Sequence, residues 1–192
     1  MSKDIILNNL IKSKELLDAF IKDPENINKI AQAGDIICDA FNAGNKIISC
    51  GNGGSMSDAM HFAEEMTGRF KEDRKSLPAI AISDPSYLSC AANDFGYDMI
   101  FARFIEGMGK ENDVLIAIST SGNSQNIIEA IKKAQLKGLK TIALTGKDGG
   151  KAATLSDMEI RAPFSKYSDR VQEIHIKVIH SIIDYVEQKL EL

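Results

Sequence analysis

The sequence predicts an α/β domain built on an open, parallel, five-stranded sheet with helices on both faces. Five short apolar runs between residues 46 and 163 alternate with stretches of helical periodicity. Such alternation of strand and helix is typical of a parallel sheet that is covered on both sides. A chain of 192 residues is long enough for one domain of this kind and leaves little for a second. We therefore treat residues 1–192 as a single domain.

Two helices are predicted before the first strand. In residues 4–21, apolar side chains recur at helical spacing (Ile6, Leu7, Leu10, Ile11, Leu17 and Phe20). Residues 26–44 repeat this pattern and end at Gly44, a common helix stop. The two segments carry more apolar surface than one small sheet needs. This surplus is consistent with a contribution of the region 1–44 to packing between subunits.

The remaining elements follow in βα order. The five predicted strands are residues 46–50, 77–84, 113–119, 140–146 and 157–163. Residues 124–138 form an amphipathic helix that stops at Gly138, and residues 168–190 form a long C-terminal helix. The stretch 69–76, RFKEDRKS, is the most loop-like charged segment.

Composition excludes several classes of protein. Lys and Arg number 23 against 27 Asp and Glu, and no basic cluster suggests a nucleic-acid partner. No apolar stretch approaches the length of a membrane span, and the N-terminus lacks a signal-peptide core. The cysteines, Cys38, Cys50 and Cys90, are odd in number and lack C-x-x-C spacing. These features predict a cytoplasmic protein with reduced thiols.

Two loops follow predicted strands at the place where open parallel sheets bind ligands. The first is CGNGGSMSD, and the second is STSGNSQN, with hydroxyls at Ser119, Thr120, Ser121 and Ser124. Helix capping by serine explains one or two of these hydroxyls, but not four in six residues. Hydroxyls and N–H groups at a helix start can hold a phosphate without Lys or Arg. Nucleotide fingerprints do not fit, because Met56 and Asp148 stand where a glycine and a hydroxyl residue are required.

Ionisable side chains follow the glycine-rich loop and recur in the last helix. His61 and Glu65 are four residues apart and share a helix face, an arrangement that is most often a surface hydrogen bond. In the last helix, Gln172 falls within an apolar strip, and His175 and His180 flank it on opposite sides. Periodicity does not choose between the two histidines. A further candidate is Asp169, which lies three residues before Gln172. Its position is explained at least as well by half of a capping box as by a catalytic role.

Four long stretches together resemble the sugar isomerase (SIS) domain family. They are CGNGGSMSDAMHFAEEMTGRF, AANDFGYDMIFARF, AISTSGNSQNIIEAI and DRVQEIHIKVIH. The resemblance covers nearly the whole chain. Within the family, the chain resembles the bacterial branch that isomerises sedoheptulose 7-phosphate. It implies an aldose–ketose isomerase that produces D-glycero-D-manno-heptose 7-phosphate through an enediol. The product would feed nucleotide-activated heptose for lipopolysaccharide or capsule.

The resemblance also implies roles for individual residues. Glu65 and His180 would transfer protons, and it is the resemblance that selects His180 over His175. Zinc, one ion per subunit, would be bound by His61, Glu65, Gln172 and His180. The family further implies a homotetramer with sites where subunits meet. Substrate would be bound by Glu65 together with Asn52, Gly53, Gly54, Ser55, Asn93, Asp94, Ser119, Thr120, Ser121, Ser124, Asp169 and Gln172.

Two alternatives remain at this point. Some SIS proteins only sense sugar phosphates, and one relative is a tetrameric partner of the bacterial replication initiator. Such proteins need the phosphate loop but not the combination of His61, Glu65, Gln172 and His180, so the sequence favours an enzyme. The second alternative is an isomerase of a pentose or hexose phosphate, which would use the same loop.

Overall fold

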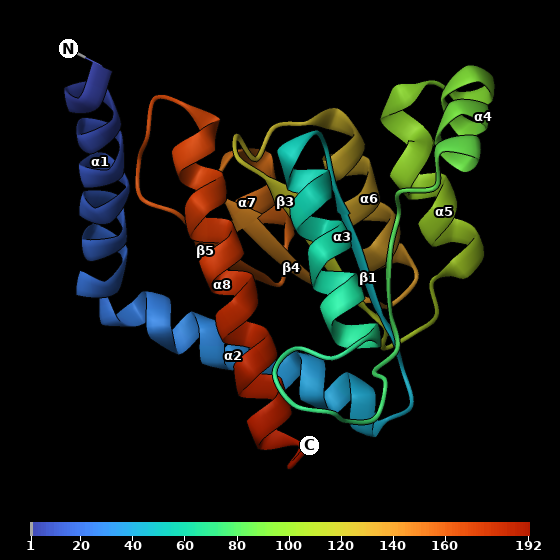
Figure 1. Cartoon of the computed structure of the whole chain (residues 1–192). Coiled ribbons are helices and arrows are strands. Elements are labelled where there is room, and N and C mark those ends of the chain that lie inside the picture. The colour runs from blue at the N-terminus through green and yellow to red at the C-terminus, as the bar shows by residue number, and fades with distance from the viewer. Residues whose placement is uncertain (1) are drawn as a thin grey trace.

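Five parallel strands in the order β2-β1-β3-β4-β5 form the centre of the computed structural model, which describes residues 2–192 (Figure 1). Each strand overlaps one of the five apolar runs, and only β1 extends past its run, by one residue, so the predicted sheet is confirmed. The strands are β1 (Ile47–Gly51), β2 (Ala79–Ala81), β3 (Val114–Ser119), β4 (Lys140–Thr145) and β5 (Met158–Arg161).

Helices cover both faces of the sheet because successive strand residues point to opposite sides. Ile47 of β1 and Ile116 of β3 join a core with helices α2 (Pro24–Asn42), α3 (Gly54–Thr67) and α8 (Ser168–Lys189). Ile48 and Leu115, the neighbouring residues, join a second core on the other face. The helices of that face are α4 (Pro85–Phe95), α5 (Ile100–Met108), α6 (Gln125–Leu136) and α7 (Gly150–Leu155), with the 3-10 turn η1 (Tyr97–Met99) between α4 and α5.

The direction in which the chain adds strands to the sheet changes between β1 and β3. From β1 the chain adds β2 on one side and then returns to build β3, β4 and β5 on the other. Gly51 at the end of β1 pairs with Ile118 of β3, so Asn52 and Ser119 follow at the same level of the sheet. Ligands of open α/β sheets bind at this kind of switch point, between the carboxyl ends of the two strands. The glycine-rich and hydroxyl-rich loops both begin here.

The two predicted N-terminal helices are confirmed as α1 (Ser2–Lys22) and α2. Asp23 separates them, and its side chain caps α2 by accepting a hydrogen bond from the Glu25 N–H at 3.0 Å. After α2 ends, Gly44 takes a φ of 76°, which favours glycine. Figure 1 shows α1 at the edge of the molecule, where it contacts α8 and α2. Its apolar side chains Ile6 and Leu10 are 63% and 65% exposed.

Hydropathy of the helices bears on membrane association. Among residues 2–192, no helix combines the length and apolar character needed to span a bilayer.

Candidate functional site

A pocket of about 300 Å³ lies between the loops that follow β1 and β3. All of its lining residues except Ile118 and Ser168 are among those that the family resemblance implies. The lining consists of Asn52, Gly53, Gly54, Ser55, Ile118, Ser119, Thr120, Ser124, Ser168 and Gln172. Five of these side chains carry hydroxyls, two are amides and none is charged. The pocket therefore offers neutral hydrogen-bond donors to a ligand.

Glycines bring the first loop close to helix α8. Gly53 precedes α3 with a φ of 57°, a conformation that side chains with a Cβ rarely adopt. At Gly54, a Cβ would lie only 2.6 Å from Nε2 of Gln172. Glycine at position 54 thus allows the Gln172 amide to rest against the first turn of α3, at one end of the contact between α3 and α8.

The second loop presents three of its four hydroxyl residues, Ser119, Thr120 and Ser124, to the pocket. Ser119 ends β3 with its side chain buried, and its Oγ lies 3.3 Å from Oγ of Ser124. Ser124 occupies the N-cap position of α6, yet its side chain makes no capping hydrogen bond, so capping is the wrong explanation for this residue. Ser121 instead accepts the Asn123 N–H at 3.2 Å within the turn and does not line the pocket. Because the first N–H groups of a helix lack intrahelical partners, the start of α6 is suited to an anion.

A pair of amides joins the two loops, and one of them, Asn126, is not predicted by the sequence motifs. Asn52 and Asn126 exchange reciprocal side-chain hydrogen bonds of 2.9 Å, and Asn126 is buried. The Tyr97 hydroxyl also donates to Oδ1 of Asn52, at 2.9 Å. These bonds hold the Asn52 amide in one orientation and leave one of its N–H groups for a ligand. Asn126 could have been found from its position, because it is a polar residue at the start of the helix that follows the hydroxyl loop.

Histidine and glutamate side chains meet where α3 passes α8. Nε2 of His61 lies 2.9 Å from Nε2 of His180 and 3.5 Å from Oε1 of Glu65. Nδ1 of His61 lies 3.1 Å from Oε1 of the more exposed Glu64. Two imidazole nitrogens and a carboxylate oxygen thus converge from two helices. Glu65 is the less exposed of the two glutamates, and its side chain is on the α8 side of the pair.

His175 and His180 occupy different environments. His175 is 1% exposed in the core, and its Nε2 donates to the carbonyl of Thr145 at 2.8 Å. Burial lowers the pKa of His175 to about 4, so the ring is neutral. His180 is only partly buried and faces His61, and burial together with His61 lowers its pKa. The structure therefore places His180 beside His61 and Glu65, and His175 away from them.

The donor set at the crossing of α3 and α8 fits a zinc ion. Zinc binds histidine nitrogen at about 2.0–2.1 Å, which puts two tetrahedral nitrogen ligands roughly 3.3 Å apart. The two Nε2 atoms are already 2.9 Å apart, with Oε1 of Glu65 beside them. His61, Glu64 and Glu65 also offer ligand atoms within 4.8 Å of one another. Gln172, the fourth implied ligand, lies against Gly54 at the end of the helix contact.

Comparison with known proteins assigns the family. Residues 10–146 match the model of the SIS domain. The phosphoheptose isomerase of Vibrio cholerae is 55% identical over 190 residues, covering 99% of this chain and 100% of that protein. The enzyme of the same name from Yersinia enterocolitica is 57% identical, covering 99% of this chain and 98% of that protein. The chain belongs to the phosphoheptose isomerase family of SIS-domain proteins.

A solved member of the phosphoheptose isomerase family has the same fold. The structure of the protein from Neisseria gonorrhoeae superposes with a TM-score of 0.91 at 36% identity, covering 98% of this chain and all of that one. The chain is therefore an isomerase, and its SIS fold extends over 98% of its length.

Besides Ser121, three substrate-binding residues that the resemblance implies lie outside both the pocket and the cluster of His61, Glu65 and His180 in this phosphoheptose isomerase family member. Asn93 and Asp94 are exposed at the end of α4, where Nδ2 of Asn93 donates to Oδ1 of Asp94 at 2.9 Å. Asp169 is exposed and lies 3.3 Å from the Arg170 guanidinium. The capping box proposed for Asp169 is wrong, because Tyr167 is the N-cap and makes no side-chain capping bond. It is the neighbouring Ser168 that lines the pocket.

Asp58 is a further candidate residue that no sequence motif predicts. It lies on α3 one turn after Gly54 and three residues before His61. Its Oδ2 is buried and has no hydrogen-bond partner among residues 2–192. Burial raises the pKa of this carboxyl to about 6, and His61 opposes the shift. Unpaired carboxylates of this kind are concentrated at functional sites.

Proposed function

We propose that the chain converts sedoheptulose 7-phosphate to D-glycero-D-manno-heptose 7-phosphate, which supplies nucleotide-activated heptose for lipopolysaccharide or capsule. One observation carries the proposal: an uncharged, hydroxyl-lined anion pocket and a cluster of proton-transfer groups lie along the same contact between α3 and α8. A phosphosugar isomerase needs both, because one end of the substrate must be held while the other reacts. Membership of the phosphoheptose isomerase family names the substrate.

The phosphate is assigned to the hydroxyl loop. Ser119, Thr120 and Ser124 line the pocket. The start of α6 adds free N–H groups and the positive end of the helix dipole, and both favour an anion. We also assign Ser121 to phosphate binding, because it belongs to the same loop. Asn52, Gly53, Gly54 and Ser55 would face the sugar hydroxyls from the opposite loop, together with Gln172.

Proton transfer is assigned to Glu65 and His180. Ketose-to-aldose isomerisation removes a proton from C1, gives an enediol, and returns a proton to C2. The Glu65 carboxylate is suited to carrying this proton. His180, whose lowered pKa favours the neutral ring, can assist ring opening or protonate the enediol oxygen. His61 faces both groups and holds their relative position.

Zinc is assigned to His61, Glu65, Gln172 and His180. When bound, the ion would polarise the carbonyl of the substrate and stabilise negative charge on its oxygen. Glu65 would then serve both as ligand and as base, so its carboxylate must leave the metal during turnover, or the metal is partly structural. Chelation tests whether the ion is needed for turnover.

A homotetramer in the cytoplasm is the assembly that we infer. The exposed apolar side chains of α1, including Ile6 and Leu10, form a stripe that a subunit contact would cover. Asn93, Asp94 and Asp169 are exposed in one chain, and sites built where subunits meet would give them access to substrate. Free thiols at Cys38, Cys50 and Cys90 agree with a reducing compartment.

Turnover of sedoheptulose 7-phosphate, with and without a chelator, tests the proposed function. We expect conversion by the untreated protein, and loss of activity on chelation that zinc restores if the metal is catalytic. Binding of the substrate without conversion would instead indicate a non-catalytic sugar-phosphate sensor. Faster conversion of a pentose or hexose phosphate than of the heptose would contradict the substrate assignment.

A further inference from the structure

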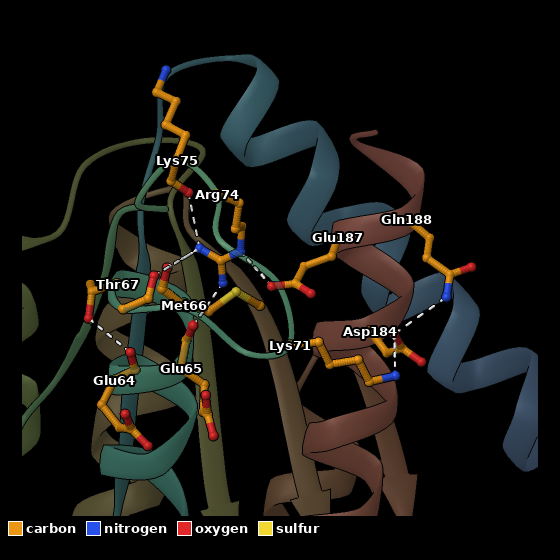
Figure 2. Close-up of polar contacts among 11 residues, drawn as sticks. Glu64, Glu65, Met66, Thr67, Lys71, Arg74, Lys75, Asp184, Glu187 and Gln188 are labelled. Atoms are coloured by element: carbon orange, nitrogen blue, oxygen red, sulfur yellow. Dashed lines mark hydrogen bonds and ion pairs between the residues drawn. The ribbon is translucent and has the colours of Figure 1, made fainter. Parts of the chain in front are cut away.

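Arg74 lies in the charged loop between α3 and β2, but it is buried rather than solvated. Only 2% of its side chain is exposed. Its Nε donates to Oε1 of Glu187 on α8, whose side chain is 10% exposed. Figure 2 shows the guanidinium between the end of α3 and this part of α8. A charged loop residue is thus part of the packing between the two helices that carry the site.

The other guanidinium N–H groups bind the last turn of α3 and the loop that follows it. Nη2 donates to the carbonyl of Glu65 at 2.8 Å, and Nη1 donates to the carbonyl of Met66 at 2.9 Å and that of Lys75 at 3.0 Å (Figure 2). The final carbonyls of a helix lack intrahelical partners, and a cation there also interacts favourably with the helix dipole. Arg74 therefore holds the backbone of Glu65 itself.

The carboxylate partner is in register with the candidate proton-transfer groups. Glu187 follows His180 by seven residues, which is nearly two full helical turns, so both side chains point toward α3. Along the contact between α3 and α8, Gln172 lies against Gly54 at one end, and His180 meets His61 further on. The Arg74–Glu187 pair closes the far end of this contact.

We propose that Arg74 is a positioning residue that, through Glu187, sets the distance between Glu65 on α3 and His180 on α8. This role rests on the proposed function, in which those two groups transfer protons. The rigid fork of the guanidinium matters because it binds the carboxylate and the Glu65 carbonyl at the same time. The phosphate pocket lies at the other end of α3 and does not depend on this pair.

The same two segments offer a matched control. Lys71 and Asp184 form an ion pair of 2.8 Å between the same loop and the same helix, also drawn in Figure 2. Their side chains are 56% and 35% exposed. No hydrogen bond from Lys71 to a carbonyl of α3 is found among residues 2–192. Asp184→Asn therefore removes an exposed ion pair between these elements without touching the last turn of α3.

The test is steady-state kinetics of Arg74→Lys, Glu187→Gln and Asp184→Asn with sedoheptulose 7-phosphate, at a temperature below the unfolding transition of each variant. For Arg74→Lys and Glu187→Gln, we expect kcat to fall roughly 10- to 100-fold while KM stays within about threefold, because the reacting groups are displaced and phosphate binding is not. Asp184→Asn should keep kcat within about twofold of the wild type.

A purely structural role predicts a different result. Arg74→Lys and Glu187→Gln would then unfold at lower temperature but keep kcat within twofold while folded, and this would overturn the proposal. A rise in KM by the same factor as the fall in kcat would also overturn it. If neither variant folds, Glu187→Asp carries the test with the same outcomes, since it keeps both charges and moves the carboxylate by one methylene.

Wild-type protein and Glu65→Gln run in the same assay separate this inference from the proposed function. If the wild type does not convert the substrate, the proposed function fails. If the wild type is active and Glu65→Gln is inactive while folded Arg74→Lys is normal, only the role of Arg74 fails.

Discussion

His61 and His180 are 119 residues apart in the sequence, yet their Nε2 atoms lie 2.9 Å apart. His175, only five residues from His180, is enclosed in the core and bonded to the carbonyl of Thr145. His175 and His180, both on α8, thus have different roles in the proposed function. One faces the reacting groups, and the other supports the packing of α8 on the sheet.

Substitution of each group tests these roles. Glu65→Gln and His180→Gln should lower kcat by a factor of about 10² to 10⁴, the usual contribution of a positioned acid or base. His175→Gln should keep most of the activity, because a glutamine can still donate to the Thr145 carbonyl. Steady-state kinetics on the three folded variants is the measurement. An essential His175 with a dispensable His180 would reverse the assignment.

Burial of His175 also predicts how stability depends on pH. Its folded-state pKa of about 4 lies below the ordinary value of 6.5, so the unfolded state binds the extra proton between these values. The contribution of His175 is therefore fully present above pH 6.5 and is lost as the pH falls toward 4. From pH 7.5 to pH 5, the wild type should lose about 2 kcal/mol more unfolding free energy than His175→Gln. Urea unfolding at both pH values measures this difference, and equal losses would show that His175 is not buried neutral.

At the scale of elements, the start of α6 separates helix capping from ligand binding. A capping serine contributes about 1 kcal/mol to stability, but the Ser124 side chain makes no capping bond. Its hydroxyl instead lies beside that of Ser119 at the pocket. This arrangement supports the proposal that the first N–H groups and hydroxyls of the element bind an anion.

Ser124→Ala should therefore weaken substrate binding by about 1–3 kcal/mol and change the unfolding free energy by less than about 0.5 kcal/mol. Calorimetric titration with substrate and urea unfolding give the two numbers. Ser181→Ala is the control, because the Ser181 hydroxyl bonds to the Lys177 carbonyl on the exposed side of α8. Unchanged substrate affinity in Ser124→Ala would remove the assignment of the phosphate to this loop.

At the scale of the whole molecule, α1 is the element that the single chain accounts for least. Leu16 and Leu17 pack against the core, and Ser13 bonds to Glu173 of α8 at 2.7 Å. The stripe that contains Ile6 and Leu10 faces solvent instead. Exposed apolar side chains at helical spacing on one element indicate a protein contact rather than chance.

We expect light scattering to give the mass of a tetramer at micromolar concentration. Leu10→Asp should shift the mass toward smaller species, because it places a charge within the apolar contact. Leu136→Asp, at a residue 81% exposed on α6, should leave the mass unchanged. A wild-type monomer under these conditions would contradict both the tetramer and the shared sites.

The sequence by itself determined the elements of this protein and most of the residues of the pocket. Apolar runs such as residues 113–119 and the periodicity of residues 124–138 are local patterns, and local backbone preferences with burial are enough to turn them into strands and helices. The glycine and hydroxyl loops were also visible, because the carboxyl ends of parallel strands share one edge of the sheet.

Only the tertiary structure decided which side chains of these elements meet. His175 and His180 lie on opposite sides of the apolar strip of α8, and helical periodicity does not distinguish them. The position of α3 decides that His180, and not His175, lies beside His61 and Glu65. Arg74 belongs to a charged segment that reads as solvated, yet α8 supplies the carboxylate that lets it be buried. The partner and the burial of a side chain depend on elements distant in the chain, and periodicity within one helix or loop carries no information about them.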